Sequence, residues 1–148
     1  MGQKKVINES FETSQGKDYP FIALYHDMLD SAAWKELTAH DIMLYLYMRR
    51  KHLRKVYKKR IVKSNKNDIS IPRAEYRKFM HQSTFEKSID HLIDLGFVKL
   101  VENHYEERKC NIYAFSDMWQ YYRTSNFKVK PECRRTLKQR LQAENQRA

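Results

Sequence analysis

The sequence predicts an α+β protein that is mostly helical and carries a small antiparallel sheet. Only 3 glycines and 3 prolines occur in 148 residues, so helices are expected to dominate over turns. Apolar residues recur at helical spacing in "STFEKSIDHLIDL", which starts with a capping signal and ends at a glycine. Two alternating apolar stretches follow that glycine and indicate a hairpin. The length suits one domain with tails.

The N-terminal part of the chain is expected to contribute a flexible tail and one short helix. Residues 1–18 are polar and lack a sustained period, which is typical of a mobile terminus. The stretch "DSAAWKEL" predicts a short helix with Asp30 or Ser31 as its N-cap. Trp34 and Leu37 would then face the core.

A long helix is expected to begin at Thr38 and to continue through residue 61. Thr38 can cap it, and Asp41 occupies the third helical position, where a carboxylate favours the helix dipole. The apolar run "IMLYLYM" makes its first half a buried central helix. Its second half lies in the basic segment 49–66, where lysines and arginines four residues apart repel one another. We expect this half to project from the core or to fray without an anionic partner, and a loop over 49–66 stays open.

A short strand and two helices should follow. "ISI", residues 69–71, precedes Pro72, which suits the first turn of a helix in "PRAEYRKFM". After a turn at "HQ", Ser83 and Glu86 form the capping box of a helix over 83–95. The apolar stripe of that helix points to the core, and the glycine at its end should adopt the left-handed conformation.

The remaining elements are a hairpin, a short helix and a tail. Residues 97–102 and 108–115 alternate as strands around the turn "NHYEE". A short helix is expected after Ser116, and residues 126–148 are expected to form a basic helical tail.

This order of elements is that of a winged helix-turn-helix, here with extra N- and C-terminal helices. The domain would span 19–125, with 49–66 as a basic extension, and strand 69–71 would join the hairpin in one small sheet. In such a fold the helix over 83–95 enters the major groove, and its N-terminal residues reach base edges. The preceding helix braces it, and the turn "NHYEE" is the wing tip.

A helical wheel of 83–95 identifies candidates for contacts with base edges. The core face is centred between Phe85 and Ile89, which leaves the opposite face and the preceding turn for DNA. Lysine can pair with guanine, and glutamine with adenine. Each of these side chains could equally belong to a solvated helix surface. The candidates are Gln82, Thr84, Lys87, Ser88 and His91.

Positive charge is concentrated in one segment. The formal net charge is +11, and 49–66 holds ten of the 29 lysines and arginines with no Asp or Glu, which leaves 19 basic and 18 acidic residues elsewhere. Such a patch is typical of proteins that bind phosphate backbones, although a solvated face or an anionic lipid site would also produce it. The candidates for phosphate contacts are Arg50, Lys51, Arg54, Lys55, Lys58, Lys59, Arg60, Arg73, Arg77, Lys78, Arg108 and Lys109.

Acidic residues in the helix over 83–95 and in the expected wing tip argue against contacts with phosphates there. Three carboxylates give residues 83–95 a net charge of −2, and two more lie in the expected wing tip. Either they lie away from the groove or accept from cytosine, or 49–66 is the main nucleic-acid surface and the helix pair is a scaffold. The residues concerned are Glu86, Asp90, Asp94, Glu106 and Glu107.

Three stretches, "PFIALYHDMLDSAAWKELTAHDIMLYLYMRR", "STFEKSIDHLIDLGFV" and "CNIYAFSDMW", resemble small winged-helix DNA-binding proteins of Firmicute conjugative transposons, plasmids and phages. The resemblance covers roughly residues 19–122, and more loosely extends to the DNA-binding domains of plasmid replication initiators. It implies DNA binding within a mobile genetic element, in replication initiation, transcription regulation or marking of a conjugative transfer origin. The chain departs from these proteins over 51–66, where a shorter turn rich in Asn and Gly would be expected.

Other classes have little support in the sequence. The 3 glycines form no phosphate-cradling loop, and neither the 6 histidines nor Cys110 and Cys133 have metal-ligand spacing. We therefore expect no enzyme, no cofactor and no metal. No stretch has the apolar length of a membrane span, and "MGQKKVINES" lacks the hydrophobic region of a signal peptide. A reduced cytoplasmic protein without a membrane partner is the expectation.

The expected function is binding of double-stranded DNA as a regulatory or accessory factor of a mobile element. The alternative is a winged-helix protein-interaction module with only non-specific nucleic-acid affinity, in which the acidic helix over 83–95 would suit a basic partner. RNA binding by tyrosines ranks third, since no RNA-binding motif is present. Homodimer formation, and contacts with replication or conjugation proteins of the same element, stay open.

Overall fold

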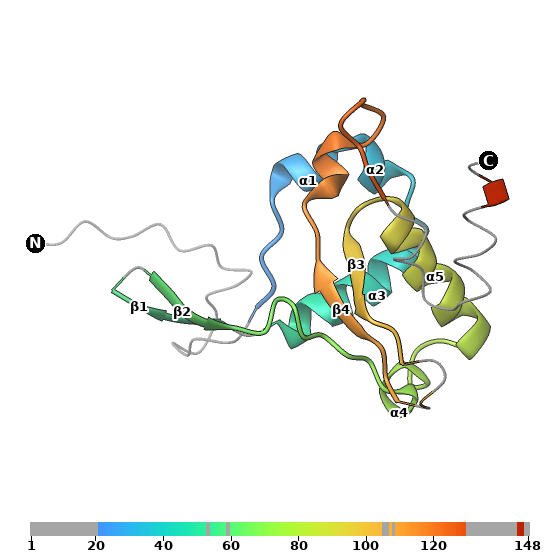
Figure 1. Cartoon of the computed structure of the whole chain (residues 1–148), viewed down its shortest axis with the longest axis horizontal. Helices are drawn as coiled ribbons and strands as arrows, with labels where there is room; N and C mark the ends of the chain where they lie inside the picture. Colours follow the sequence, from blue (N-terminus) through green and yellow to red (C-terminus); the bar gives the residue numbers. More distant parts are fainter. Residues whose placement is uncertain are drawn as a thin grey trace, which may run out of the picture.

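The computed structural model describes residues 21–52, 54–58, 60–104, 107, 109–129 and 145–146, with the backbone alone for 54–57 and 60–62. The tail expected over 1–18 lies outside the described residues, as does most of the helical tail expected over 126–148. A body of helices and a two-stranded sheet carries a second hairpin that stands apart from it (Figure 1). None of the helices in the described part is long and apolar enough to cross a membrane.

The body is built on two 13-residue helices that pack together beside a sheet. α3 (Ala39–Lys51) packs on α5 (Gln82–Asp94), and α5 also contacts strand β3 (Val98–Glu102). Aromatic rings fill the space between them. The Tyr45 ring lies within 6.0 Å of the rings of Trp34, Phe97 and Phe115, measured between centroids. Burial raises the pKa of the Tyr45 hydroxyl to about 12, so this ring is neutral and belongs to the core.

Two short helices cover one end of this core. α1 (His26–Asp30) was not expected, and it buries Met28. α2 (Ala32–Lys35) has Ser31 as its N-cap, as expected, and the Ser31 hydroxyl accepts a hydrogen bond from the Trp34 N–H at 3.2 Å. The Trp34 ring packs edge-on against Phe97, so the segment is fixed to the core by one large side chain.

The capping of α3 confirms the expected start of the central helix. The Thr38 hydroxyl accepts from the Asp41 N–H at 3.2 Å, and the Asp41 carboxylate accepts from the Thr38 N–H at 2.9 Å. The expected continuation through residue 61 is wrong, because α3 ends at Lys51 with His52 as its C-cap.

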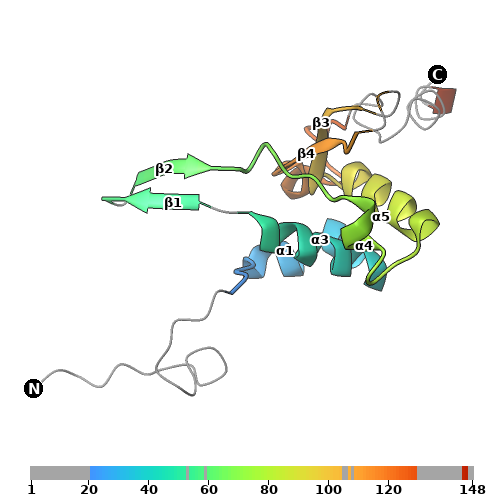
Figure 2. The same ribbon diagram turned by 90° about the horizontal axis from the view of Figure 1, so that it is seen from below.

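The basic segment beyond α3 forms a β-hairpin. β1 (Arg54–Tyr57) pairs with β2 (Arg60–Ser64), and Lys58 in the turn has a φ of 48°. A helix here would stack like charges four residues apart, whereas the pairs "VY" and "IV" favour strands. We call β1, β2 and their turn the arm. Figure 2 shows the arm extending away from the helices of the body.

A tight helix pair follows the arm. The N-cap of α4 (Arg73–Tyr76) is Pro72, and the Tyr76 ring stacks on Phe85 of α5 with centroids 4.0 Å apart. α5 begins one residue earlier than expected, because His81 is its N-cap and its Nδ1 atom accepts from the Ser83 N–H at 3.3 Å. The expected capping box of Ser83 and Glu86 is therefore wrong: an imidazole nitrogen has taken the place of the serine hydroxyl.

The sheet of the body packs against α5 through β3. β3 pairs with β4 (Ile112–Phe115), and Ile69 joins them through one antiparallel bridge to Tyr113, with N···O distances of 3.0 and 2.7 Å. The expected pairing of 69–71 with the hairpin is thus confirmed at one residue. Gly96 ends the helix at a φ of +85°, as expected, and a 3₁₀ helix, η2 (Met118–Tyr121), packs against that turn.

Candidate nucleic-acid interface

The exposed part of α5 is its first turn and a half. Gln82, Ser83 and Lys87 are exposed, and Thr84 is half-buried. Ser88 is only 3% exposed, so its selection as a contact to base edges is wrong. On a helical wheel Ser88 lies at the flank of the core face, where a small side chain is easily covered. The candidates that stay accessible therefore cluster at the N-terminal end of the helix.

His91 takes part in a contact within the protein. Its Nδ1 atom hydrogen-bonds the carboxylate of Asp41, which is buried in the first turn of α3. The same carboxylate closes the capping box at Thr38. His91 thus connects the C-terminal half of α5 to the start of α3, and its selection as a base contact does not fit this geometry.

We expect His91→Ala to destabilise the fold by about 1–2 kcal/mol, because the buried Asp41 carboxylate loses one of its partners. Chemical denaturation measures the change, and His26→Ala, which removes an exposed histidine from α1, is the matched control. DNA sequence preference should stay the same in both variants. A change in preference with unaltered stability would return His91 to the set of base contacts.

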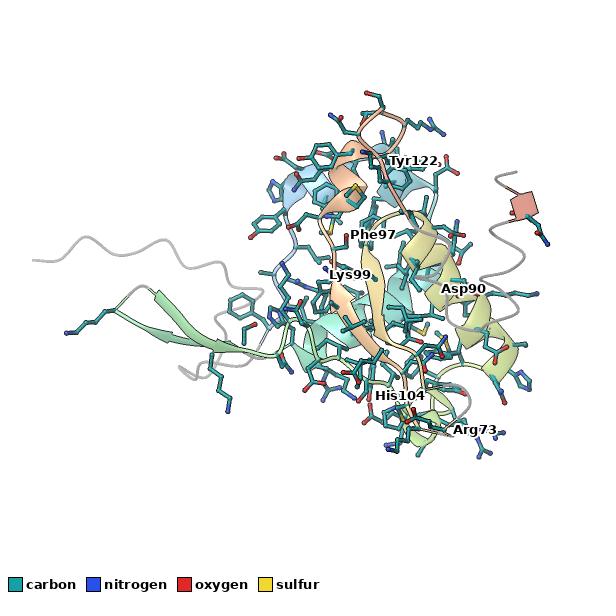
Figure 3. All side chains as sticks on the ribbon, viewed as in Figure 1. Arg73, Asp90, Phe97, Lys99, His104 and Tyr122 are labelled. Carbon is teal, nitrogen blue, oxygen red and sulfur yellow. The ribbon has the colours of Figure 1, made fainter. Side chains whose placement is uncertain are left out.

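The acidic residues of α5 do not form a continuous exposed face. Asp90, labelled in Figure 3, is only 6% exposed, and Glu86 and Asp94 are half-buried. The Glu86 carboxylate also accepts a hydrogen bond from the Gln82 amide at 3.3 Å. The side of α5 that a duplex could approach is consequently less acidic than the net charge of the helix indicates.

α4 adds positive charge beside the N-terminus of α5. Arg73 and Arg77 are exposed, and neither makes an ion pair with another described residue. Both line a pocket of about 370 Å³ together with Met80, His81 and Gln82. The N-terminal N–H groups of a helix favour anions, and guanidinium groups bind phosphate oxygens in pairs. These side chains make this corner a candidate phosphate site.

Lys51 has a different role from the one expected. Its ammonium group donates to the Glu75 carboxylate at 2.7 Å and to the Ser70 carbonyl at 2.5 Å. The Tyr47 hydroxyl donates to the same carboxylate at 2.9 Å. The hydrogen bond from Lys51 lowers the pKa of Glu75, while desolvation and the bond to Glu75 raise the pKa of Tyr47. Lys51 therefore holds α4 to the end of α3.

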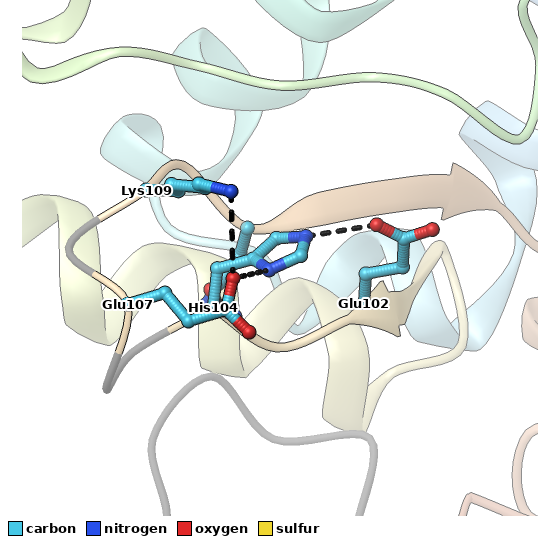
Figure 4. Close-up of polar contacts among 5 residues, drawn as sticks. Glu102, His104, Glu107 and Lys109 are labelled. Atoms are coloured by element: carbon cyan, nitrogen blue, oxygen red, sulfur yellow. Dashed lines mark hydrogen bonds and ion pairs between the residues drawn. The ribbon is translucent and has the colours of Figure 1, made fainter.

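The turn after β3 contains a cluster of charges, shown in Figure 4. The His104 ring contacts Glu102 through Nε2 at 2.8 Å and Glu107 through Nδ1 at 3.1 Å, and Lys109 lies 3.7 Å from Glu107. The hydrogen bond to Glu102 raises the pKa of His104 above its ordinary value of 6.5, and Glu107 adds to this effect. When His104 is protonated, these four side chains carry no net charge.

We expect the His104 ring to titrate above pH 6.5, which NMR of the ring protons measures directly. A raised pKa means that the contribution of His104 to folding is complete below pH 6.5 and is lost as pH rises through the folded value. Above it the turn gains net negative charge, which would weaken any contact of this turn with a polyanion such as DNA. His104→Gln should remove this pH dependence, and Glu102→Gln should move the pKa back toward 6.5. Titration at or below 6.5 in the wild-type protein would contradict this reading.

The structure places the candidates for phosphate contacts on several elements. Arg73, Arg77 and Lys78 are exposed around α4, and Arg50 is exposed on α3. The arm contains Arg54, Lys55, Lys58 and Arg60, of which Lys58 is exposed in the turn. Lys109 is exposed and paired with Glu107, while Lys59 and Arg108 lie outside the described residues.

The sequence did not predict the carboxylates that bind Lys51 and His91. Glu75 was the only carboxylate in "PRAEYRKFM", a weak signal that one of the basic residues nearby would be paired. No sequence pattern pointed to the contact between Asp41 and His91, which are 50 residues apart.

Among the described residues, no group of three or more His, Cys, Asp or Glu side chains is arranged to hold a metal ion. The chain matches no protein-family model, no curated protein and no solved structure.

Proposed function

We propose that this protein binds double-stranded DNA through a winged helix-turn-helix formed by α4, α5 and the β3–β4 hairpin. One observation carries the proposal: the accessible part of α5 is its N-terminal end, and it is flanked by Arg73 of α4 and by Arg77 at the α4 C-cap, neither of which forms an ion pair with another described residue. Recognition helices contact base edges with their N-terminal residues while the preceding helix binds the backbone. The net charge of +11 supports a polyanionic partner.

The mechanism divides the contacts between two helices. Arg73 and Arg77 bind phosphates and set the register of the protein on the duplex, which carries no sequence information. Lys87 and Gln82 then reach base edges in the major groove, where lysine pairs with guanine and glutamine with adenine. The stacking of Tyr76 on Phe85 fixes the angle between the two helices, so the two kinds of contact act together.

We further propose that the protein serves a mobile genetic element, in replication initiation, transcription regulation or at a conjugative transfer origin. This part rests on the resemblance of the sequence to small winged-helix proteins of such elements. A cytoplasmic location and the absence of catalysis belong to the same proposal. Replication or conjugation proteins of that element are the partners it would meet on DNA.

Selection from random genomic fragments at physiological salt, with excess competitor DNA, tests the proposal. Enrichment of one region is expected, and its position beside a replication origin, a promoter or a transfer origin assigns the role. If excess competitor DNA abolishes all binding, specific DNA binding is overturned and a protein-interaction module is favoured.

Two substitutions then test the division of contacts on the enriched site. Lys87→Ala should reduce discrimination between the site and unrelated DNA by about 10- to 100-fold, because base contacts carry about 1–3 kcal/mol each. Arg77→Ala should weaken binding to both about equally and reduce the salt dependence. Equal effects of both substitutions on discrimination would contradict the assignment of α5 as the recognition helix.

A further inference from the structure

The backbone of the arm pairs mainly with itself. β1 and β2 contact each other extensively, and neither strand makes a comparable contact with another described helix or strand. Figures 1 and 2 both show the hairpin extending from the body on the side opposite α5. A two-stranded hairpin on its own is at best marginally stable in water.

Its charge adds to this instability. Residues 54–63 contain six lysines and arginines and no Asp or Glu. The register places Lys55 opposite Lys63, and like charges in directly opposed positions destabilise a strand pair. Next to an anionic surface the same basic side chains would stabilise the hairpin. The charge of the arm therefore favours an anionic partner.

The base of the arm, in contrast, is held firmly. The Asn65 amide donates to the Lys51 carbonyl at 2.9 Å, and the His52 ring lies 3.1 Å from the Ser64 hydroxyl, between Nε2 and Oγ. The His52 ring also packs against Phe115 of the core, with centroids 5.4 Å apart. The arm is thus a basic ribbon that is attached to the body at a fixed point.

We propose that the arm binds the phosphate backbone of duplex DNA beyond the segment that α5 contacts, and so lengthens the binding site on one side. This inference rests on the proposed function. A five-residue strand is about 17 Å long, which corresponds to about five base pairs of duplex. A two-stranded ribbon is too wide for an ordinary minor groove, so the arm lies along the backbone or over the major groove. Figure 1 shows the arm and α5 on opposite sides of the body, so a duplex that runs past the body would contact α5 with one part and the arm with the next.

Matched triple variants test the inference on a duplex taken from the enriched region. The arm variant carries Lys55→Gln, Lys58→Gln and Lys63→Gln. The control variant carries Lys35→Gln, Lys99→Gln and Lys128→Gln, which remove the same charge from exposed positions outside the arm. Hydroxyl-radical footprinting and the salt dependence of affinity are measured for both variants and the wild-type protein.

The arm variant should lose protection over about five base pairs at one edge of the footprint and keep the rest. The slope of log affinity against log salt should become shallower by about two to three, while the control variant changes it less. An unchanged footprint in the arm variant would overturn the inference, even if wild-type protein binds the site. If the wild-type protein enriches no region, the proposed function itself fails, and the two failures are thereby distinguished.

Two further measurements cover the remaining outcomes. Amide hydrogen exchange in β1 and β2 should slow on a duplex that spans the whole footprint, and not on one trimmed to the central part. Slowing on both duplexes or on neither would overturn the inference. Vesicles containing phosphatidylserine provide the other anionic surface: if the arm variant loses vesicle binding and keeps the full footprint, the arm is a membrane contact instead.

Discussion

Raising the salt concentration from 50 to 200 mM is expected to weaken the complex with duplex DNA by about 10³- to 10⁵-fold, the range for six to ten phosphate contacts. The effect arises because each lysine or arginine that binds a phosphate releases a condensed counterion. The exposed basic residues in and after α4 and the charges of the arm together are enough to supply this number of contacts. Fluorescence anisotropy with a labelled duplex at several salt concentrations measures the slope.

The same series on unrelated DNA provides the control. Non-specific binding rests almost wholly on phosphate contacts, so its slope should be at least as steep as that of the selected site. A slope near −1 for the selected site would mean that one phosphate is engaged, and the basic surfaces would then have another partner.

Gly96→Ala is expected to lower the free energy of unfolding by about 3 kcal/mol and the melting temperature by on the order of 10–20 °C. Gly96 has a φ of +85°, which costs any other residue strain. A Cβ atom there would also lie 2.6 Å from the Trp119 nitrogen and 2.7 Å from the Met118 carbonyl carbon. Both are backbone atoms, so the crowding cannot be relieved by a side-chain rotation.

Circular dichroism melting curves measure this loss, and Lys99→Ala, at an exposed position in β3, is the control. Binding to DNA should be retained below the lowered melting temperature, because Gly96 lies at the C-terminal end of α5 and the candidate contacts lie at the other end. A melting temperature within 2–3 °C of wild type would mean that the turn and η2 can separate.

The elements that could be predicted from the sequence are those whose signals are local. The Thr38 cap with Asp41, the Ser31 cap, the stop at Gly96 and the alternation after it each lie within a few residues. The stripe of Phe85, Ile89, Leu92 and Ile93 also placed the core face of α5 correctly, since all four are buried.

The features that could not be predicted depend on competition between two local structures or on contacts with residues far away in the sequence. Residues 54–64 have basic residues compatible with either a helix or a hairpin, and the balance between charge repulsion and strand propensity decided for strands. His81 is the cap because its ring nitrogen accepts from the Ser83 N–H, which starts the helix at Gln82, ahead of the start that a Ser83 cap requires. Three predicted contact residues, His91, Lys51 and Ser88, are instead held in contacts with carboxylates or buried. These contacts join distant parts of the chain, so no short stretch of sequence predicts them.

The hydrogen bond between Asn65 and the carbonyl of Lys51 has a consequence for how this chain can be altered. The chain leaves the body and returns to it at one point, so everything between these residues is an insert whose two ends are already joined. Inserts of this kind can be shortened, lengthened or exchanged without disturbing the domain that carries them. The protein is therefore modular at this position: under the proposed DNA contacts, a graft of different length should change how much DNA is covered, while the choice of sequence stays with the domain.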